Sequence, residues 1–203
     1  MNDTDPLGFW DNLYAGRPAV RDPRPNARLT EIVSGLPIGD ALDLGCGAGG
    51  DALWLARQGW KVTATDISPV AVSRLAELAR SLNLPITAEQ HELGQTFPAG
   101  RFDLVSAHYF HTPFALDRVK VLRTAAEVLN PGGHLLIVDH GSVAPWSWDQ
   151  DATIPSVAAK VAELALEAPW TVERAAALNR LATGPNGQSA EVTDHVILIR
   201  RVR

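Results

Sequence analysis

Cysteine is scarce in this chain of 203 residues, where it occurs once, at Cys46. A lone thiol excludes an intrachain disulfide framework. Cys46 lies inside a glycine-rich turn, so we expect it to fill space there rather than to act as a nucleophile.

Long apolar runs and an excess of positive charge are also missing. No run approaches the roughly 20 residues that a membrane-spanning helix needs, and Met1–Asp5 is polar and acidic, unlike a signal peptide. The formal net charge of −5 argues against a broad phosphate-binding face. We therefore expect a cytoplasmic protein with no membrane partner and no nucleic-acid partner.

What the chain does have is an alternation of short strands and helical segments, which predicts an α/β fold. Crossover units of this kind build a Rossmann-like, doubly wound, mostly parallel sheet, which we expect to have seven strands. An appended N-terminal helix is expected at residues 29–36, with Asn26 as its cap, and Val196–Ile199 is expected to pair with 170–174 as a C-terminal antiparallel hairpin. One more strand is predicted to end at the glycine turn, and four others are predicted at 61–66, 86–91, 102–108 and 134–139. One more helix is predicted to follow Gly50, and three others are predicted at 72–82, 122–129 and 154–164.

The most informative segment is the run from Ala41 to Gly50, an apolar strand that ends in a glycine turn. Gly45, Gly47 and Gly50 satisfy the dinucleotide pattern G-x-G-x-x-G, in which a ligand approaches bare backbone. Asp43 precedes the turn, where its charge would repel a pyrophosphate but would stabilise the sulfonium and ammonium groups of S-adenosylmethionine. A second interpretation is that Asp43 only accepts hydrogen bonds from the amides of its own turn.

The next predicted strand ends in Asp66, about twenty residues past the glycines, where a carboxylate can bind both hydroxyls of a ribose. This observation supports an adenosine cofactor without separating a dinucleotide from S-adenosylmethionine. The alternative role of Asp66 is to cap the following helix, but Ser68 and Pro69 already have the typical sequence of a cap and first helical position.

These motifs resemble the class I S-adenosylmethionine-dependent methyltransferases over roughly residues 9–140. Three further segments, Phe9–Tyr14, Gly50–Ala56 and Asp66–Pro69, are similar to the thiopurine and tellurite-resistance type. The resemblance implies S-adenosylmethionine as the cofactor and implies that an acid after the third strand contacts adenine, a position that Glu92 and Leu93 occupy although Asp is more usual. It places the following residues in the cofactor site: Trp10, Tyr14, Asp43, Gly45, Cys46, Gly47, Gly49, Asp66, Ile67, Glu92, Leu93 and His108.

Such methyltransferases present reactive residues after the fourth strand, where this chain has His108 and His111. Imidazole is a common general base, so either side chain could take that role. A soft sulfur, selenium or tellurium anion needs no base, however, and both histidines could simply pack beside the cofactor. Without clustered cysteines or an H-x-x-x-H helix, we predict no metal.

Four aromatic side chains lie on polar segments. Trp10 and Tyr14 are expected either to form a lid over the methionine end of the cofactor or to pin the N-terminus as a hydrophobic clasp. Trp146 and Trp148 follow the fifth strand and are expected to border either the acceptor pocket or a dimer contact, so a monomer and a homodimer both stay open.

With 46% apolar residues, the chain can bury a core as one domain over 1–203. We divide it into a lid and helix (1–37), a cofactor-binding core (38–140) and an acceptor side (141–203). The predicted function is methyl transfer to a small molecule, first to sulfur or another chalcogen. The alternatives are an O- or N-methyltransferase, a non-catalytic S-adenosylmethionine-binding module, and a nicotinamide-dependent oxidoreductase, which Asp43 and the lack of a Tyr-x-x-x-Lys pair disfavour.

Overall fold

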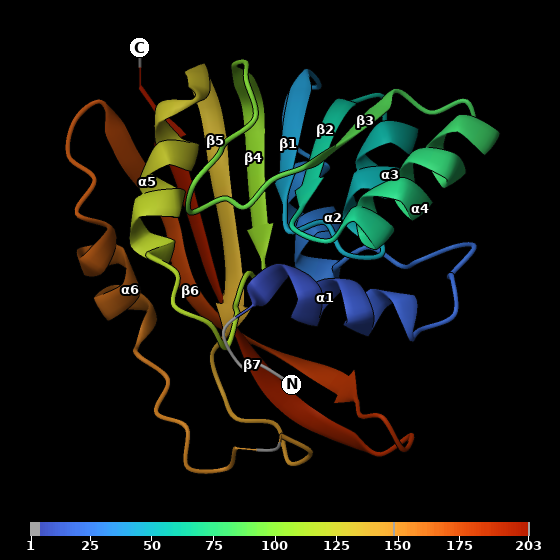
Figure 1. The fold of residues 1–203 in the computed structure, drawn as a ribbon. Coiled ribbons are helices and arrows are strands. Elements are labelled where there is room, and N and C mark those ends of the chain that lie inside the picture. The colour runs from blue at the N-terminus through green and yellow to red at the C-terminus, as the bar shows by residue number, and fades with distance from the viewer. Residues whose placement is uncertain (1–4, 148, 203) are drawn as a thin grey trace.

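The computed structural model describes residues 5–147 and 149–202, and its centre is one seven-stranded sheet (Figure 1). The strand order is β3-β2-β1-β4-β5-β7-β6. The first five strands run parallel, and β7 pairs antiparallel with both β5 and β6. This confirms the predicted fold class. The strands are β1 (Asp40–Leu44), β2 (Lys61–Asp66), β3 (Ile86–Gln90), β4 (Phe102–His108), β5 (Leu129–His140), β6 (Trp170–Thr183) and β7 (Ser189–Arg201).

Helices cover both faces of the sheet. The elements α2 (Ala27–Val33), α3 (Gly50–Arg57) and α4 (Pro69–Ser81) pack on one face, and α5 (Arg118–Glu127) and α6 (Val157–Leu164) pack on the other. The remaining helix, α1 (Pro6–Ala15), lies across the carboxyl ends of the strands (Figure 1). None of the helices within the described residues is long and apolar enough to cross a membrane.

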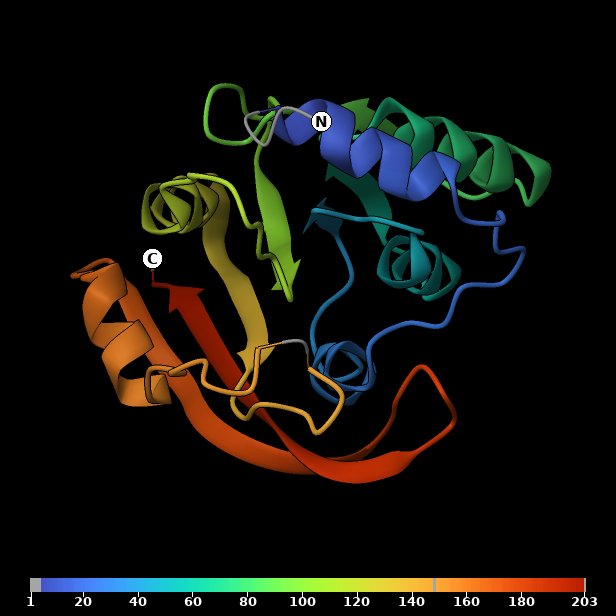
Figure 2. The ribbon, with the colours of Figure 1, turned by 60° about the horizontal axis from the view of Figure 1, so that its bottom comes forward.

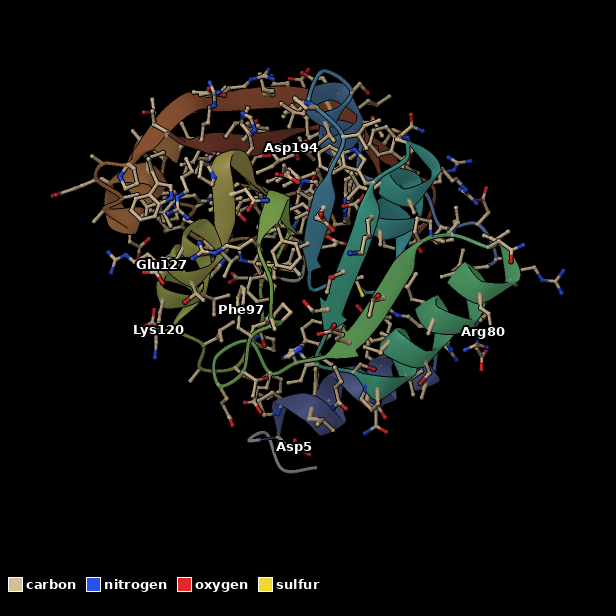
Figure 3. The ribbon with its side chains drawn as sticks, turned by 90° about the horizontal axis from the view of Figure 1, so that it is seen from above. Asp5, Arg80, Phe97, Lys120, Glu127 and Asp194 are labelled. Atoms are coloured by element: carbon tan, nitrogen blue, oxygen red, sulfur yellow. The ribbon has the colours of Figure 1, made fainter. Side chains whose placement is uncertain are left out.

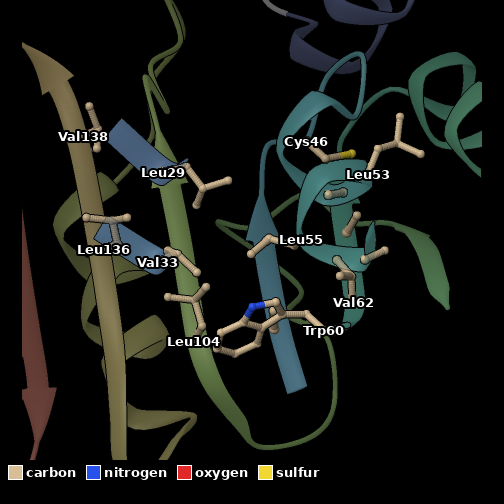
Figure 4. Packing of buried hydrophobic residues seen from close by; sticks show 14 of the residues in the cluster. Leu29, Val33, Cys46, Leu53, Leu55, Trp60, Val62, Leu104, Leu136 and Val138 are labelled. Atoms are coloured by element: carbon tan, nitrogen blue, oxygen red, sulfur yellow. The ribbon is translucent and has the colours of Figure 1, made fainter. Parts of the chain in front are cut away.

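The core consists of two apolar layers, one on each face. Figure 4 shows the layer under α2 and α3, where Trp60 is 2% exposed and packs near Leu55 and Leu104. The opposite layer joins α5 to β4 and β5 through residues such as Leu122 and Ile137. Because β4 and β5 are apolar on both faces, they lie in the centre of the sheet, as buried parallel strands do.

Local sequence signals set the ends of α3 and α4 as predicted. Ser68 Oγ accepts from the amide of Ala71 at 3.2 Å, and Pro69 is the first residue of α4. The helix α3 stops before Gly59, whose φ of 100° lies in the left-handed region. The end of α3 leads into β2, and the start of α4 ends the loop that follows β2.

Other boundaries differ from the sequence predictions. Strand β5 begins at Leu129, so the assignment of Leu129 to the preceding helix was wrong; its backbone already pairs with Phe102 across a register shift. Strand β3 ends at Gln90, one residue early. The side chain of Asn26 does not cap α2, because it donates to Asp51 instead.

The C-terminal hairpin is longer than predicted and turns at residues 184–187, where the amide of Gly187 donates to Gly184. Residues 175–177 form part of β6 and pair with β7, which excludes the helical turn that alanine favours. The hairpin reaches past the rest of the sheet and curves around α2 (Figure 2).

Candidate functional site

A cavity of about 300 Å³ opens at the carboxyl ends of the parallel strands, where doubly wound sheets bind ligands. Helix α1, the loops after β1, β2 and β3, and the segment after β4 form its wall. The residues that line it are Pro6, Trp10, Tyr14, Gly45, Asp66, Ile67, His91, Glu92, Leu93, His108, Tyr109, Phe110, His111, Thr112, Phe114, Ala115 and Leu116.

The glycine turn after β1 brings bare backbone to this cavity. Gly45 has a φ of 68°, and a Cβ added there would lie 2.9 Å from the ring of Phe110. The next amide, that of Cys46, donates to Thr65 on β2 at 2.8 Å and fixes the turn against the sheet. Glycine is therefore required at this position both for the backbone angle and for the close approach.

Asp43 lies beneath the turn and is 3% exposed. Its Oδ1 accepts from Ser106 Oγ at 2.9 Å, whereas its Oδ2 has no hydrogen-bond partner among the described residues. Burial and the nearby Asp51 raise the pKa of Asp43 to about 7. No amide of its own turn donates to Asp43 in the described part of the chain, so the turn-stabilising role considered for it is not observed.

Asp66 forms part of the cavity wall at the end of β2. One of its oxygens accepts from the amide of Gly47 at 2.9 Å and the other from the amide of Ser68 at 3.0 Å. Burial raises the pKa of Asp66 even though these backbone bonds act in the opposite direction. The two bonds orient the carboxylate and leave each oxygen with capacity to accept from a ligand.

Three other residues predicted for the cofactor site, Ile67, Glu92 and Leu93, also line the cavity. Both acids that were expected to hold adenosine, one after β2 and one after β3, thus lie on one wall.

Cys46, Gly47 and Gly49, also predicted for the cofactor site, do not line this cavity. Cys46 packs into the core (Figure 4), and burial raises the pKa of its thiol well above the ordinary value. Gly49 begins α3 with a φ of 82°. A Cβ on Gly47 would lie 2.8 Å from the hydroxyl oxygen of Tyr14, and Gly47 borders a second groove between α1 and α4. These three residues therefore shape the glycine turn without lining the cavity.

Trp10 and Tyr14 reach the cavity from α1, a helix that the sequence analysis did not predict. Asp11 on the same helix accepts from Ser68 Oγ at 2.8 Å and from the amide of Val70 at 2.9 Å, which fastens α1 to the start of α4. The segment therefore covers the cavity as the lid hypothesis expects and is also pinned as the clasp hypothesis expects.

The other end of α1 meets the segment after β4. Trp10 Nε1 donates to Thr112 Oγ1 at 3.4 Å, and the ring of Phe9 meets that of Phe114 edge-on at 5.2 Å. Helix α1 thus joins the two sides of the cavity mouth.

His108 is buried, with its side chain 2% exposed. Its Nδ1 lies 2.6 Å from Asp51 Oδ2, and its Nε2 has no partner among residues 5–147 and 149–202. Asp51 also accepts from the backbone amide and the side-chain amide of Asn26 at 2.6 and 2.7 Å. Burial alone would raise the pKa of Asp51, but the hydrogen bonds from His108 and Asn26 outweigh it and lower that pKa.

His111 has a different environment at the cavity mouth, where its side chain is 45% exposed. Its Nε2 lies 3.3 Å from Asp139 Oδ1. Asp139 is also bound by Arg118 at 2.6 Å and by Lys160 at 3.2 Å. Although burial acts against it, these three basic groups hold the pKa of Asp139 well below its usual range. Of the two histidines, only His111 is open to an incoming acceptor.

Tyr109, between the two histidines, was missed by the sequence analysis. It has a φ of 48°, and its hydroxyl donates to Asp194 at 2.9 Å. Asp194, labelled in Figure 3, is fully buried on β7. It also binds Arg28 and Arg180. No local pattern could have revealed this contact, because it joins β4, β7 and α2.

Trp146 does not line this cavity. It packs on the hairpin turn, where a Cβ on Gly184 would lie 2.6 Å from its indole. Trp148 lies outside the described residues.

The chemistry of the wall fits a cationic adenosyl compound. Within the described residues, the wall carries the acids Asp66 and Glu92 and no lysine or arginine. Asp43 does not itself line the cavity, but it lies two residues before Gly45, and its Oδ2 has no partner among the described residues. Asp43, Asp66 and Glu92 would therefore hold S-adenosylmethionine, whereas a pyrophosphate would meet groups of its own charge.

Comparison with protein families places a methyltransferase domain at residues 41–133. The chain is 31% identical over 132 residues to the ubiquinone biosynthesis O-methyltransferase of Cronobacter sakazakii, a match that covers 63% of this chain and 53% of that protein. It spans about half or less of the length of the curated relatives it matches.

Two solved structures cover nearly the whole chain. One, from a study of the conversion of a disulfide bond into a thioacetal group during echinomycin biosynthesis, is 28% identical with a TM-score of 0.74, over 97% of this chain and 93% of the other. The second, TehB from Haemophilus influenzae, is 18% identical with a TM-score of 0.69, over 96% and 67%. Together these findings confirm the resemblance drawn from the glycine turn and the two acids.

Proposed function

We propose that this chain, which carries a methyltransferase domain match at residues 41–133, is an S-adenosylmethionine-dependent methyltransferase that transfers a methyl group to a small molecule whose accepting atom is sulfur or a heavier chalcogen. The observation that carries the proposal is the acidic cavity wall without lysine or arginine, backed by the unpartnered carboxylate oxygen of Asp43. This wall suits a sulfonium compound and leaves the apolar remainder of the cavity for the acceptor.

Sulfur is favoured by the similarity over 97% of the chain to the structure associated with conversion of a disulfide to a thioacetal. An oxygen acceptor is the second candidate, because the ubiquinone biosynthesis relative is an O-methyltransferase. Trp10, Phe110 and Phe114 give the cavity an aromatic lining that suits a planar or apolar acceptor of either kind.

The cofactor, when bound, supplies an electrophilic methyl group on a sulfonium. Asp66 and Glu92 accept hydrogen bonds from the adenosine part, and Trp10 and Tyr14 exclude water from above. His111 takes the acceptor proton at Nδ1, while its Nε2 faces Asp139 and the resulting imidazolium is stabilised by that carboxylate. An acceptor that arrives as an anion skips this proton transfer.

The first experiment is a thermal-shift comparison of S-adenosylmethionine, S-adenosylhomocysteine and NAD. We expect the first two to raise the melting temperature and NAD to leave it unchanged. Stabilisation by NAD alone would overturn the assignment.

The second experiment measures formation of S-adenosylhomocysteine with thiols, inorganic tellurite, catechols and amines as acceptors. We expect turnover with thiols to exceed that with catechols and amines. Faster turnover of catechols would make the chain an O-methyltransferase, and binding without any turnover across the panel would favour a non-catalytic binding module.

We also propose that residues 1–203 form one domain, because β6 and β7 complete the sheet that β1 begins. Limited proteolysis should then leave the region 38–203 protected as one unit. Separate release of the region 141–203 would contradict a single domain.

A further inference from the structure

A second groove lies between helix α4 and the loop that follows α1. Its volume is about 630 Å³, compared with about 300 Å³ for the cavity of the candidate site. Grooves of this size hold small organic molecules. Among the described residues, Tyr14 is the one that lines both hollows, so the groove is a separate place in the fold.

The floor of this groove is apolar. Ala71, Leu78 and Leu82 lie along α4 at helical spacing, and Pro18 and Val20 line the groove from the loop. Val20 is 54% exposed and Leu82 is 42% exposed. Large apolar side chains that are open to solvent within one groove indicate a surface that an apolar ligand would cover.

Three arginines line the same groove. Arg17 and Arg21 belong to the loop, and Arg74 belongs to α4. None of the three forms an ion pair within the described residues, and the acid that lines the groove with them is Glu77. The chain as a whole has a net charge of −5, so three positive charges against one negative depart from its composition. A carboxylate is a ligand group that such a cluster favours.

Arg74 is already oriented for this role. Its Nη1 donates to the backbone oxygens of Tyr14 and Arg17, at 2.6 and 3.0 Å. Its Nε and Nη2 donate to no group in the described part of the chain. These two nitrogens form the edge of a guanidinium that binds a carboxylate through two parallel hydrogen bonds. Because the third nitrogen is held by the backbone, less side-chain entropy is lost when a ligand binds to the other two.

We propose that this groove binds a small apolar carboxylic acid, with its carboxylate on Arg74 and the two loop arginines and its apolar body on Leu78 and Leu82. An inorganic anion would meet the arginines but would leave the apolar floor exposed. A neutral hydrocarbon would cover the floor but would leave the arginines without a counterion. The inference goes beyond the proposed function and does not depend on it, because the ligand is neither the cofactor nor the acceptor.

The test compares octanoate, octan-1-ol and octylamine, which share one hydrocarbon chain and differ in charge. By calorimetry at pH 7, the wild-type chain should bind octanoate about fivefold more tightly than octan-1-ol, as one exposed ion pair provides. Octylamine should bind more weakly than octan-1-ol, because the arginines repel its ammonium group. Equal affinities for the three ligands would overturn the inference, since recognition would then be apolar alone.

Variants of the loop locate the binding. Arg17→Gln and Arg21→Gln change exposed side chains and should each weaken octanoate about two- to fivefold while leaving octan-1-ol unchanged. Arg80→Gln is the matched control, because Arg80, labelled in Figure 3, is exposed on α4 and does not line the groove. It should bind octanoate as the wild-type chain does. A loss in the control as large as in the loop variants would indicate a general charge effect and would overturn the inference.

A competition experiment separates the groove from the cavity. Saturating S-adenosylhomocysteine should leave the binding of octanoate in place, and displacement of octanoate would overturn the inference by placing the acid in the cavity. If S-adenosylhomocysteine does not bind, the proposed function fails, but the loop variants still decide this inference.

Two other occupants of the groove would also overturn it. One is a second copy of the chain, shown by self-association that Arg21→Gln abolishes. The other is a membrane surface, shown by binding to phosphatidylglycerol vesicles without binding of dissolved octanoate.

Discussion

Removing the carboxylate of Asp194 should destabilise the fold more than any change at an exposed ion pair. Asp194 is fully buried, and its Oδ2 lies 2.8 Å from Arg180 Nε and 3.2 Å from Arg28 Nε. The hydroxyl of Tyr109 donates to its other oxygen at 2.9 Å. The substitution Asp194→Ala would remove the carboxylate that binds Arg180 and would leave Arg28 with Glu31 as its ion-pair partner.

Breaking a buried pair from one side typically costs about 3–5 kcal/mol, because the remaining charge stays buried and unpaired. For a domain of this size, one kcal/mol lowers the melting temperature by about 2–4 °C. We therefore expect Asp194→Ala to lower it by about 6–20 °C, and Asp194→Asn to lower it less, since an amide oxygen still accepts a hydrogen bond.

Urea denaturation followed by circular dichroism gives the free energy of unfolding directly. The control is Glu173→Ala on the same hairpin, because the side chain of Glu173 is 35% exposed and its ion pairs should contribute less than about 1 kcal/mol. A loss for Asp194→Ala no larger than that of the control would show that the network contributes nothing beyond a surface pair.

Three further predictions concern the site. Burial raises the pKa of Asp43 to about 7, so binding a cation next to it should lower that pKa and release about half a proton per ligand at pH 7. Calorimetry in buffers of different ionisation enthalpy should detect the proton release, and Asp43→Asn should abolish it. Trp10→Ala should weaken binding of S-adenosylmethionine by about two- to thirtyfold through the lost cation–π contact. Leu7 is exposed on the same helix, and Leu7→Ala should not weaken this binding. Equal effects of both substitutions would favour a hydrophobic clasp that only pins the N-terminus. His111→Ala should slow methylation of a protonated thiol about a hundredfold but leave the rate unchanged at a pH where that thiol is ionised, so an equal loss at both pH values would exclude a proton-transfer role.

The cofactor half of the site was predictable because its signals are local. Glycines at a turn, an acid on each side of it and a Ser-Pro helix start are all encoded within a few residues of one another. The structure puts Asp66, Glu92 and Gly45 on one wall, as the end-of-strand argument requires. The carboxyl ends of parallel strands meet at one edge of the sheet, so these positions follow from the order of elements.

The features that were missed depend on contacts between distant residues. Asp51 was visible as the residue after the glycines, but only the fold brings His108 and Asn26 to it. Helix α1 was missed because it buries no residue and takes its place from the contacts of Asp11 with α4 rather than from an apolar stripe. Leu129 was misplaced because an apolar residue after a helix fits its last turn as well as the first position of a buried strand.

The contacts that fasten α1 to α4 couple the position of α1 to cofactor binding. Asp11 binds Ser68 and Val70, two and four residues after Asp66, so one short connection carries both the acid proposed to bind the ribose and the contacts that fasten α1. A nucleoside bound to Asp66 would therefore also stabilise the contacts between α1 and α4, and loss of those contacts would weaken the binding of the nucleoside. We therefore expect the position of α1 and the binding of an adenosine cofactor to be coupled.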